Sequence, residues 1–148
     1  MNITWSCKAF NSLTPAELYS ILQLRNEVFV VEQNCVYQDC DDKDLQSHHF
    51  MGWQQEKLVA YTRLLPAAVA YKEISIGRVV TSPSVRGTKT GKALMEKSIE
   101  KIQELFGRSP IHIGAQLYLK SFYESLGFIP CSDVYLEDGI KHIKMIRN

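Results

Sequence analysis

The composition of this chain is that of a folded protein without a nucleic-acid-binding surface. Its 148 residues are 45% hydrophobic and 22% charged, with a formal net charge of +1. A chain of this kind can bury a hydrophobic core without disulfides or metal ions. A protein that binds along nucleic-acid phosphates needs a concentrated basic excess, which this net charge excludes.

The sequence also lacks the signals of a membrane or secreted protein. No stretch approaches the roughly 20 apolar residues of a membrane span, and the N-terminal residues lack the basic region and apolar run of a signal peptide. We find no internal repeat and no low-complexity linker. We therefore expect a single domain over residues 1–148, located in the cytoplasm.

Residues 4–46 predict a strand, a capped helix and an acidic loop. The strand is expected at Thr4–Phe10. Residues 14–17 (T-P-A-E) combine an N-cap hydroxyl, a proline at the first helical position and a capping-box glutamate, so a helix should run from Pro15 to about Val31. Residues 32–46 are polar and rich in side chains that favour turns, which predicts a loop.

A group of metal-ligating residue types lies at the end of this loop. Cys35, Cys40, His48 and His49 fall close together in the sequence. The spacing C-x4-C is wider than in the usual zinc sites, adjacent histidines on a strand point to opposite faces, and no C-x-x-C pair exists. We therefore expect free thiols and no metal.

The middle of the chain predicts three strands and a basic loop. Strands are expected at Ser47–Trp53 and Lys57–Leu65, followed by a bend at 66–70 and a β-branched strand that Pro83 ends. Residues 79–93 then read V-V-T-S-P-S-V-R-G-T-K-T-G-K-A. Apolar residues at about 3.6-residue spacing follow as far as Phe106, which indicates a helix.

The junction between that loop and that helix can bind phosphate. The N–H groups of residues 87–91 would be unpaired donors at the positive end of the helix, where a pyrophosphate can lie. The Walker A spacing and the Rossmann spacing both fail. The loop alone therefore leaves open an ordinary basic loop before a surface helix.

Residues 110–129 predict a short strand, a helix and the start of another strand. Leu119, Phe122, Tyr123 and Leu126 fall on one helical face. A phenol beside the core, as at Tyr123, can turn its hydroxyl toward a cleft and donate a proton, and the alternative is a packed ring with a satisfied hydroxyl. Strands at Phe128–Tyr135 and Lys141–Arg147 complete the chain.

Two motifs of this chain resemble the GCN5-related N-acetyltransferase (GNAT) family. They are V-x5-V-R-G-x3-G-x2-L-M from Val79 and A-Q-x5-F-Y-x3-G-F from Ala115. With W-x-C-K-x-F and the residues up to Gln33, the chain resembles the ElaA-like branch over residues 4–147. The resemblance implies an α+β fold, in which a mixed, mostly antiparallel twisted sheet is flanked by helices on both faces.

The resemblance implies acetyl-CoA as co-substrate. The strand backbone would bind the pantetheine arm, and the loop, R-x-x-G-x-G/A in the family, would bind the pyrophosphate; here Lys89 replaces the middle glycine. The residues assigned to the cofactor in this way are Val79, Val80, Thr81, Arg86, Gly87, Thr88, Lys89, Thr90, Gly91, Lys92 and Gln116.

The same resemblance implies direct acetyl transfer to an amine, with Tyr123 as the general acid for the departing thiolate. A base must take a proton from the amine, and a histidine titrates in the useful range. His48 and His49 are therefore the expected catalytic partners, one of which should face the site, while Glu32, Glu73 and His112 are further candidates.

The expected partner is a small-molecule or peptide amine, without nucleic acid or membrane, and a homodimer is left open beside a monomer. The loop aspartates Asp39, Asp41, Asp42 and Asp44 are expected to form a solvated rim that attracts a cationic amine. Arg25 and Arg63 are candidate charges of the acceptor site, but we expect them to be solvated ends of amphipathic elements. Two alternatives remain: a sensor that binds acyl-CoA without transfer, and a longer-chain acyltransferase, suggested by R-x-x-V-F at 25–29.

Overall fold

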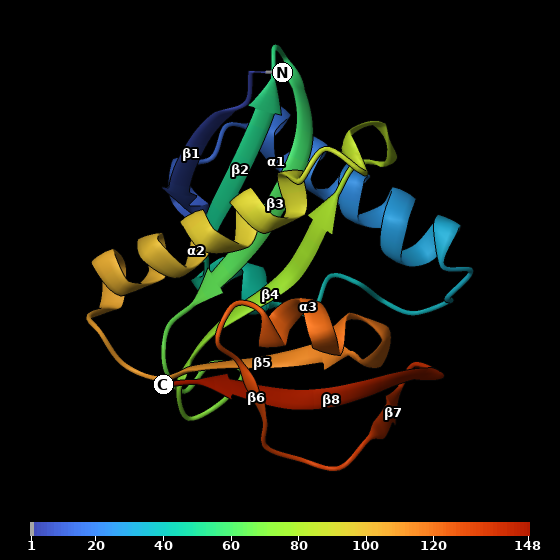
Figure 1. Ribbon diagram of the computed structural model, residues 1–148. Coiled ribbons are helices and arrows are strands. Elements are labelled where there is room, and N and C mark those ends of the chain that lie inside the picture. Colours follow the sequence, from blue (N-terminus) through green and yellow to red (C-terminus); the bar gives the residue numbers. More distant parts are fainter. Residues whose placement is uncertain (1) are drawn as a thin grey trace.

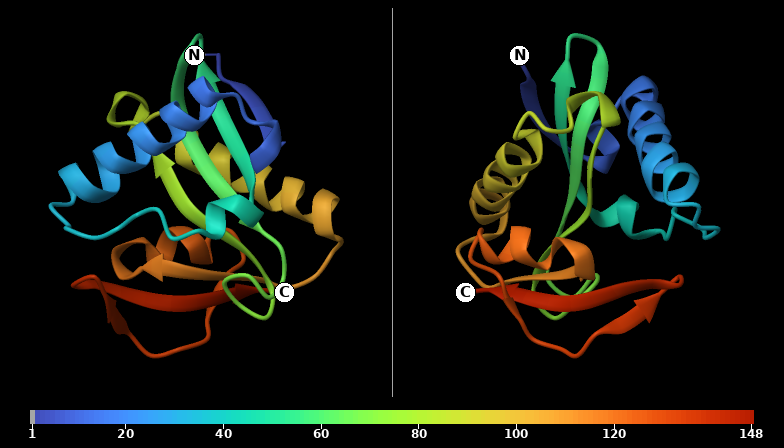
Figure 2. Two further views of the ribbon diagram at one scale, coloured as in Figure 1. Left: turned by 180° about the vertical axis from the view of Figure 1, so that it is seen from behind. Right: turned by 45° about the vertical axis from the view of Figure 1, so that its right-hand side comes forward.

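The computed structural model describes residues 2–148 and shows a twisted sheet between two layers of helices (Figures 1 and 2). The strand order is β1-β2-β3-β4-β5-β8-β6, with β7 paired to β8. Among residues 2–148, only β4 and β5 are parallel neighbours. The strands are β1 (Thr4–Ala9), β2 (His48–Gln54), β3 (Lys57–Leu65), β4 (Ile74–Thr81), β5 (Ile111–Gln116), β6 (Ile129–Pro130), β7 (Tyr135–Glu137) and β8 (Ile140–Arg147). The predicted fold class is thus confirmed.

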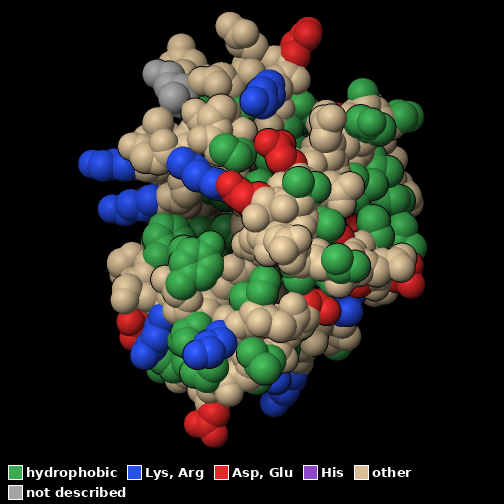
Figure 3. Space-filling model, turned by 90° about the vertical axis from the view of Figure 1, so that its right-hand side faces the viewer, with side chains coloured by type: hydrophobic (Ala, Val, Ile, Leu, Met, Phe, Trp, Pro, Cys, Tyr) green, Lys and Arg blue, Asp and Glu red, His purple; other side chains and the backbone are tan. Residues whose placement is uncertain are grey.

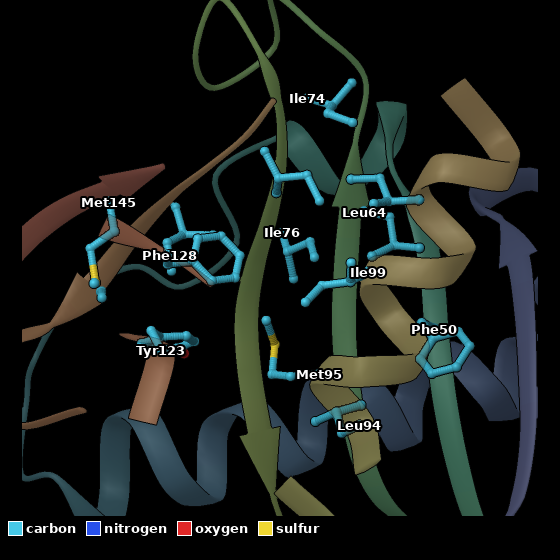
Figure 4. Close-up of a cluster of buried hydrophobic side chains, with 14 of the residues drawn as sticks. Phe50, Leu64, Ile74, Ile76, Leu94, Met95, Ile99, Tyr123, Phe128 and Met145 are labelled. Carbon is cyan, nitrogen blue, oxygen red and sulfur yellow. The ribbon is translucent and has the colours of Figure 1, made fainter. Parts of the chain in front are cut away.

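The helices bury one hydrophobic cluster on each face of the sheet. Helix α1 (Pro15–Arg25) covers one face, and α2 (Thr90–Phe106) and α3 (Lys120–Glu124) cover the other (Figure 2). The larger cluster, under α2 and α3, contains Phe50, Leu64, Ile76, Leu94 and Tyr123 (Figure 4). The smaller cluster, under α1, contains Ile21, Leu24, Met51, Tyr61 and Val80. Successive strand residues such as Phe50 and Met51 feed opposite clusters, as the pleat requires.

Helix α1 begins at the predicted capping box and ends in a wider turn. The Thr14 hydroxyl accepts a hydrogen bond from the Glu17 amide at 3.1 Å, and the Glu17 carboxylate accepts one from the Thr14 amide at 2.8 Å. The chain then continues as the π-helical segment η2 (Asn26–Glu32), where hydrogen bonds span five residues. The expected helix end near Val31 is confirmed, but its last turns are π-helical.

Strand β4 carries a bulge that separates it from β5. Tyr61 of β3 pairs with Val80 and Arg63 pairs with Gly77, so Arg78 and Val79 together oppose the single Thr62. Arg78 has a φ of 50°, in the left-handed region. β4 and β5 pair only at their first residues, 74–75 with 111–112. Beyond that point the two strands part, and the free edge of β4 faces an opening.

The strand expected at Phe128–Tyr135 is wrong as one element, because the structure divides it into β6 and β7. Pro130 has no N–H to continue the ladder. Instead, the Ser132 hydroxyl accepts a hydrogen bond from the Lys144 amide at 2.9 Å. The other predicted strands and the helix α2 agree with the structure to within one or two residues. No helix in residues 2–148 is both long and apolar enough to cross a membrane.

Candidate active site

A cleft of about 1040 Å³ lies where β4 and β5 separate. It is lined by η2, the free edge of β4, the loop before α2, the end of β5, α3 and the β7–β8 turn. Figure 3 shows the side of the molecule onto which the carboxyl ends of β4 and β5 point, and hydrophobic side chains lie there beside acidic and basic ones around a hollow. A cleft of this size can hold an extended ligand together with a second molecule.

The loop before α2 keeps room for a group beside its backbone. Gly87 and Lys89 have left-handed φ values of 78° and 64°, and α2 begins at Thr90. Lys89 therefore holds the conformation that a glycine would adopt most easily. A Cβ atom on Gly91 would meet nothing within 4 Å, and Arg86 and Gly91 both line the cleft. The donors at this helix start therefore fit a pyrophosphate.

Glu32 reaches across the cleft mouth to this loop. The two guanidinium nitrogens of Arg86 donate to its carboxylate at 2.6 and 2.5 Å. These hydrogen bonds from Arg86 hold the pKa of Glu32 below its usual range. Glu32 is thus an ion-paired group at the surface, which disfavours the role of proton acceptor.

Tyr123 projects from α3 between the core and the cleft. Tyr123 is 5% exposed. Its ring packs edge-on against Phe122 with ring centroids 5.2 Å apart, and against Phe128 with centroids 6.0 Å apart (Figure 4). Burial raises the pKa of Tyr123, so its hydroxyl stays protonated at neutral pH. Because Tyr123 also lines the cleft, this hydroxyl is available as a donor there.

Gln116 marks the opposite side of the cleft. In β5, Ile113 and Ala115 belong to the core under α2 and α3, so Gln116 points to the other face of the sheet. Its side-chain amide and that of Gln33 donate to each other, both at 3.2 Å. This amide pair ties the end of η2 to the end of β5 beside the cleft.

The structure does not bring His48 or His49 to the cleft. His49 is fully buried; one ring nitrogen donates to the Asp44 carbonyl at 2.9 Å, and the other lies 2.7 Å from the Tyr61 hydroxyl. His48 lies edge-on against Phe106 of α2, with ring centroids 5.6 Å apart. Neither residue is among those that line the cleft. The assignment of a catalytic base to this pair is therefore not supported by the geometry.

His112 and Glu73 form a pair of their own away from the cleft lining. Their side chains lie 3.1 Å apart, and Tyr71 stacks on the His112 ring with centroids 3.8 Å apart. His142 lines the cleft but is not among the site residues predicted from the sequence, because no local sequence signal shows that β8 lies beside β5. Gln116 and His142 are direct partners in that ladder.

Of the loop aspartates, Asp42 is exposed, but Asp39, Asp41 and Asp44 do not form a solvated rim, and Arg25 and Arg63 are not solvated ends. The expectation fails because arginines from three elements neutralise these carboxylates inside the protein. Arg25 is 0% exposed and Arg63 is 4% exposed. The ion pairs are Arg25 with Asp39 and Asp44 at 2.7 and 2.8 Å, Arg63 with Asp41 and Asp44 at 2.7 and 3.1 Å, and Arg78 with Asp39 and Asp41 at 2.7 and 3.4 Å. We call this set of six residues the ion-pair cluster.

The ion-pair cluster predicts a loss of stability in acid. Burial opposes ionisation of Asp41 and Asp44, but hydrogen bonds and charge from Arg63 and Arg25 hold the pKa of each carboxyl below its usual range. A carboxyl with a depressed pKa in the folded state stabilises the protein above its unfolded pKa of about 3.9 and loses that contribution as the pH falls. The free energy of unfolding should therefore decrease from about pH 5 downward, as urea denaturation at a series of pH values would measure.

Asp41→Asn tests this dependence against its neighbour. The variant should be less stable than the wild type at neutral pH and should lose less stability between neutral pH and pH 3. Asp42→Asn, which changes an exposed carboxylate, is the matched control and should retain the wild-type slope. Equal acid slopes in the wild type and Asp41→Asn would contradict the argument.

The four cysteines are free thiols. Within residues 2–148, no group of three or more His, Cys, Asp or Glu side chains is arranged to hold a metal ion. Cys35 instead joins two parts of the cleft wall, because its thiol donates to the Asp138 carbonyl at 3.4 Å.

Comparisons with known proteins agree with this geometry. The sequence model of the acetyltransferase (GNAT) domain matches residues 14–148. The chain is 46% identical to protein ElaA of Escherichia coli over 98% of this chain and 96% of ElaA, and the ElaA crystal structure superposes with a TM-score of 0.93 at coverages of 99% and 100%.

Two further structures share the fold. An acyl-CoA N-acyltransferase from Pseudomonas aeruginosa has a TM-score of 0.95 and 44% identity, covering 99% of this chain and 100% of that one. An aminoglycoside 6'-N-acetyltransferase complexed with coenzyme A has a TM-score of 0.71 at 17% identity, covering 99% and 96%. The chain belongs to the GNAT acetyltransferase family and to its ElaA-like branch.

Proposed function

We propose that this protein transfers an acetyl group from acetyl-CoA directly to an amine. The observation that carries the proposal is the cleft between β4 and β5, which has open space beside Gly91 and Tyr123 in its lining. The coenzyme A in the structure of the aminoglycoside acetyltransferase, which shares the fold, supports the same ligand class.

The cleft offers separate places for the parts of acetyl-CoA. The edge of β4 from Val79 to Thr81 has no β5 partner, so its free amides and carbonyls suit the pantetheine arm. The loop from Arg86 to Lys92 suits the pyrophosphate. Tyr123 then donates its hydroxyl proton to the thiolate that leaves as the new C–N bond forms.

The amine is proposed to enter from the face of the sheet that carries Gln116. Glu137 and Asp138, on the β7–β8 turn, line the cleft there, and neither forms an ion pair with a lysine or arginine among residues 2–148. These two carboxylates, rather than the loop aspartates, would attract a positively charged small molecule or peptide.

Release of the CoA thiol in the presence of a panel of amines tests the transfer reaction. Acetyl-CoA with spermidine, tyramine or lysine should give thiol and acetylated amine in equal amounts. Binding of acetyl-CoA without any thiol release would favour the acyl-CoA sensor, and faster turnover of longer acyl-CoAs would favour the longer-chain acyltransferase.

Gly91→Glu should abolish the stabilisation of the protein by acetyl-CoA. A ligand at about 100 times its dissociation constant adds roughly 2.7 kcal/mol to native stability, which a melting curve detects. The substitution puts bulk and negative charge into the open space beside the loop, so the rise in melting temperature should vanish.

Gly91→Ala is the matched control, because its Cβ meets nothing within 4 Å and brings no charge. It should retain most of the melting shift. A full shift in the Gly91→Glu variant would place the pyrophosphate elsewhere.

A further inference from the structure

We propose that Nε2 of His142 is the atom that accepts the proton from the acceptor amine. The inference rests on the proposed acetyl transfer and assigns the base that this reaction needs. Of the four histidines in the sequence, only His142 lines the cleft. The other three have different contacts. His49 contacts Tyr61 and Asp44, His48 packs against Phe106, and His112 contacts Glu73 and Tyr71.

The sheet places His142 on the amine side of the cleft. His142 lies directly opposite Gln116 in the β5–β8 ladder and opposite Tyr135 in the β7–β8 ladder. Directly opposed residues of an antiparallel pair share one face of the sheet. Ile143 and Met145 point to the core, so His142 faces away from it, toward the side where Gln116 borders the cleft.

The hydrogen bond of the other ring nitrogen fixes the tautomer. Nδ1 of His142 lies 2.7 Å from the Ile140 carbonyl oxygen. A carbonyl oxygen only accepts, so Nδ1 carries the proton of the neutral ring and Nε2 carries the lone pair. His142 is thus presented to the cleft as a base rather than as a donor.

A carboxylate stands ready to stabilise the protonated ring. Oε2 of Glu137 lies 3.5 Å from Nε2 of His142, and the Glu137 side chain is 60% exposed. An ionised carboxylate cannot donate to Nε2, so the contact becomes attractive only when the ring takes up a proton. The Glu137 carboxylate therefore favours the imidazolium that forms when His142 acts.

Few other charges lie close to this ring. The ring of Tyr135 in β7 lies 5.8 Å from the His142 ring, measured between centroids. Nζ of Lys144 lies 5.9 Å from the centroid of the Tyr135 ring. Asp138 is in the adjoining turn, where the Cys35 thiol donates to its carbonyl. Burial raises the pKa of Tyr135, so this phenol is neutral near pH 7, and Glu137 is the anion closest to Nε2.

The acceptor nitrogen loses two protons in the course of the reaction. The acceptor ammonium gives one proton to Nε2, the neutral nitrogen forms a bond to the acetyl carbon, and the C–S bond breaks. The thiolate takes the hydroxyl proton of Tyr123, and the second proton lost by the nitrogen restores that hydroxyl through water. The imidazolium of His142 then releases its proton to solvent, so one proton is released for each amide formed.

The test compares two histidine–glutamate pairs of the same chain. His142→Asn, in the cleft, and His112→Asn, outside it, are assayed with acetyl-CoA and the best amine of the panel from pH 5.5 to pH 9. His142→Asn should lower kcat/KM at least about tenfold near pH 7 and remove the acidic limb of its pH profile. His112→Asn should keep the wild-type kcat/KM and the acidic limb of its pH profile. Both variants should keep the melting shift with acetyl-CoA.

Glu137→Gln provides a variant on an exposed side chain that will fold. Loss of the carboxylate removes the charge that faces Nε2 at 3.5 Å, so kcat/KM near pH 7 should fall, by less than in His142→Asn. Nitrogen-15 NMR of the histidine rings gives a readout independent of turnover: the neutral His142 ring should carry its proton on Nδ1.

The outcomes separate this proposal from the proposed function. Turnover with an unchanged pH profile in His142→Asn, or a neutral ring protonated on Nε2, would overturn the role of His142 and leave acetyl transfer intact. Binding of acetyl-CoA by the wild type without turnover of any amine would overturn the transfer reaction, and the base with it.

Discussion

Tyr123→Phe is expected to lower kcat by about 10²-fold or more while the affinity for acetyl-CoA stays nearly unchanged, since general-acid help is usually worth 10² to 10⁴. The ring should still fill its place between Phe122 and Phe128. The variant lacks only the hydroxyl, whose raised pKa keeps it protonated throughout the working range. Steady-state kinetics and an acetyl-CoA melting shift would measure the two quantities separately.

Tyr118→Phe is the matched control for this prediction. Tyr118 also lines the cleft, but it is 74% exposed and its hydroxyl reaches solvent. Its loss should change kcat less than about threefold, because a water molecule can replace an exposed hydroxyl. If Tyr123→Phe and Tyr118→Phe gave the same turnover as the wild type, Tyr123 would be a packing residue only.

Local signals in the sequence predict the elements on the side of the cleft where we propose that the cofactor binds. The capping box at residues 14–17 and the apolar spacing of α2 each depend on residues within one or two helical turns of each other. The glycines at 87 and 91 likewise report on backbone conformation and free space at their own positions. Such features need no knowledge of the remaining chain.

The opposite side, where we propose that the amine binds, could not be predicted in this way, because it depends on which strands become neighbours. His142 follows β7 in the chain, yet its partner across the ladder is Gln116, and the β4 bulge at Arg78 is visible only through pairing with β3. His48 and His49 have the right chemistry at the wrong end of the sheet. Their residue type made them candidates for the base, but the strand topology places them away from the cleft.

The ion-pair cluster shows the same limit for charged residues. Arg25 and Arg63 have the sequence context of surface residues, because a charge at the end of an amphipathic element usually reaches water. Their burial becomes intelligible only with their partners, since Arg25 pairs with Asp39 and Asp44 across sequence separations of 14 and 19 residues. A buried charge is tolerated when its hydrogen bonds are satisfied.

Arg25→Met is expected to lower the free energy of unfolding by about 3–5 kcal/mol, because it takes one of two arginine partners from each of two buried carboxylates, Asp39 and Asp44. Burial opposes the charge of Arg25, but hydrogen bonds and charge from Asp44 and Asp39 raise its pKa, so the wild-type guanidinium is always ionised. Methionine fills a similar volume, so the loss reflects the charge rather than a cavity. Urea denaturation at neutral pH would measure it.

Lys8→Met is the control, because the Lys8–Glu17 pair at 3.0 Å is partly exposed and such pairs contribute about 0–1 kcal/mol. A comparable loss of unfolding free energy in both variants would mean that the buried ion pairs of the cluster contribute no more to stability than an exposed pair. Burial raises the pKa of Asp44, and the hydrogen bond and charge of Arg25 help to lower it, so this carboxylate would also be easier to protonate in Arg25→Met. The variant should therefore regain part of its relative stability toward pH 4, where the wild type loses its own. An Arg25→Met deficit that stays constant from pH 7 to pH 4 would attribute the loss to packing instead.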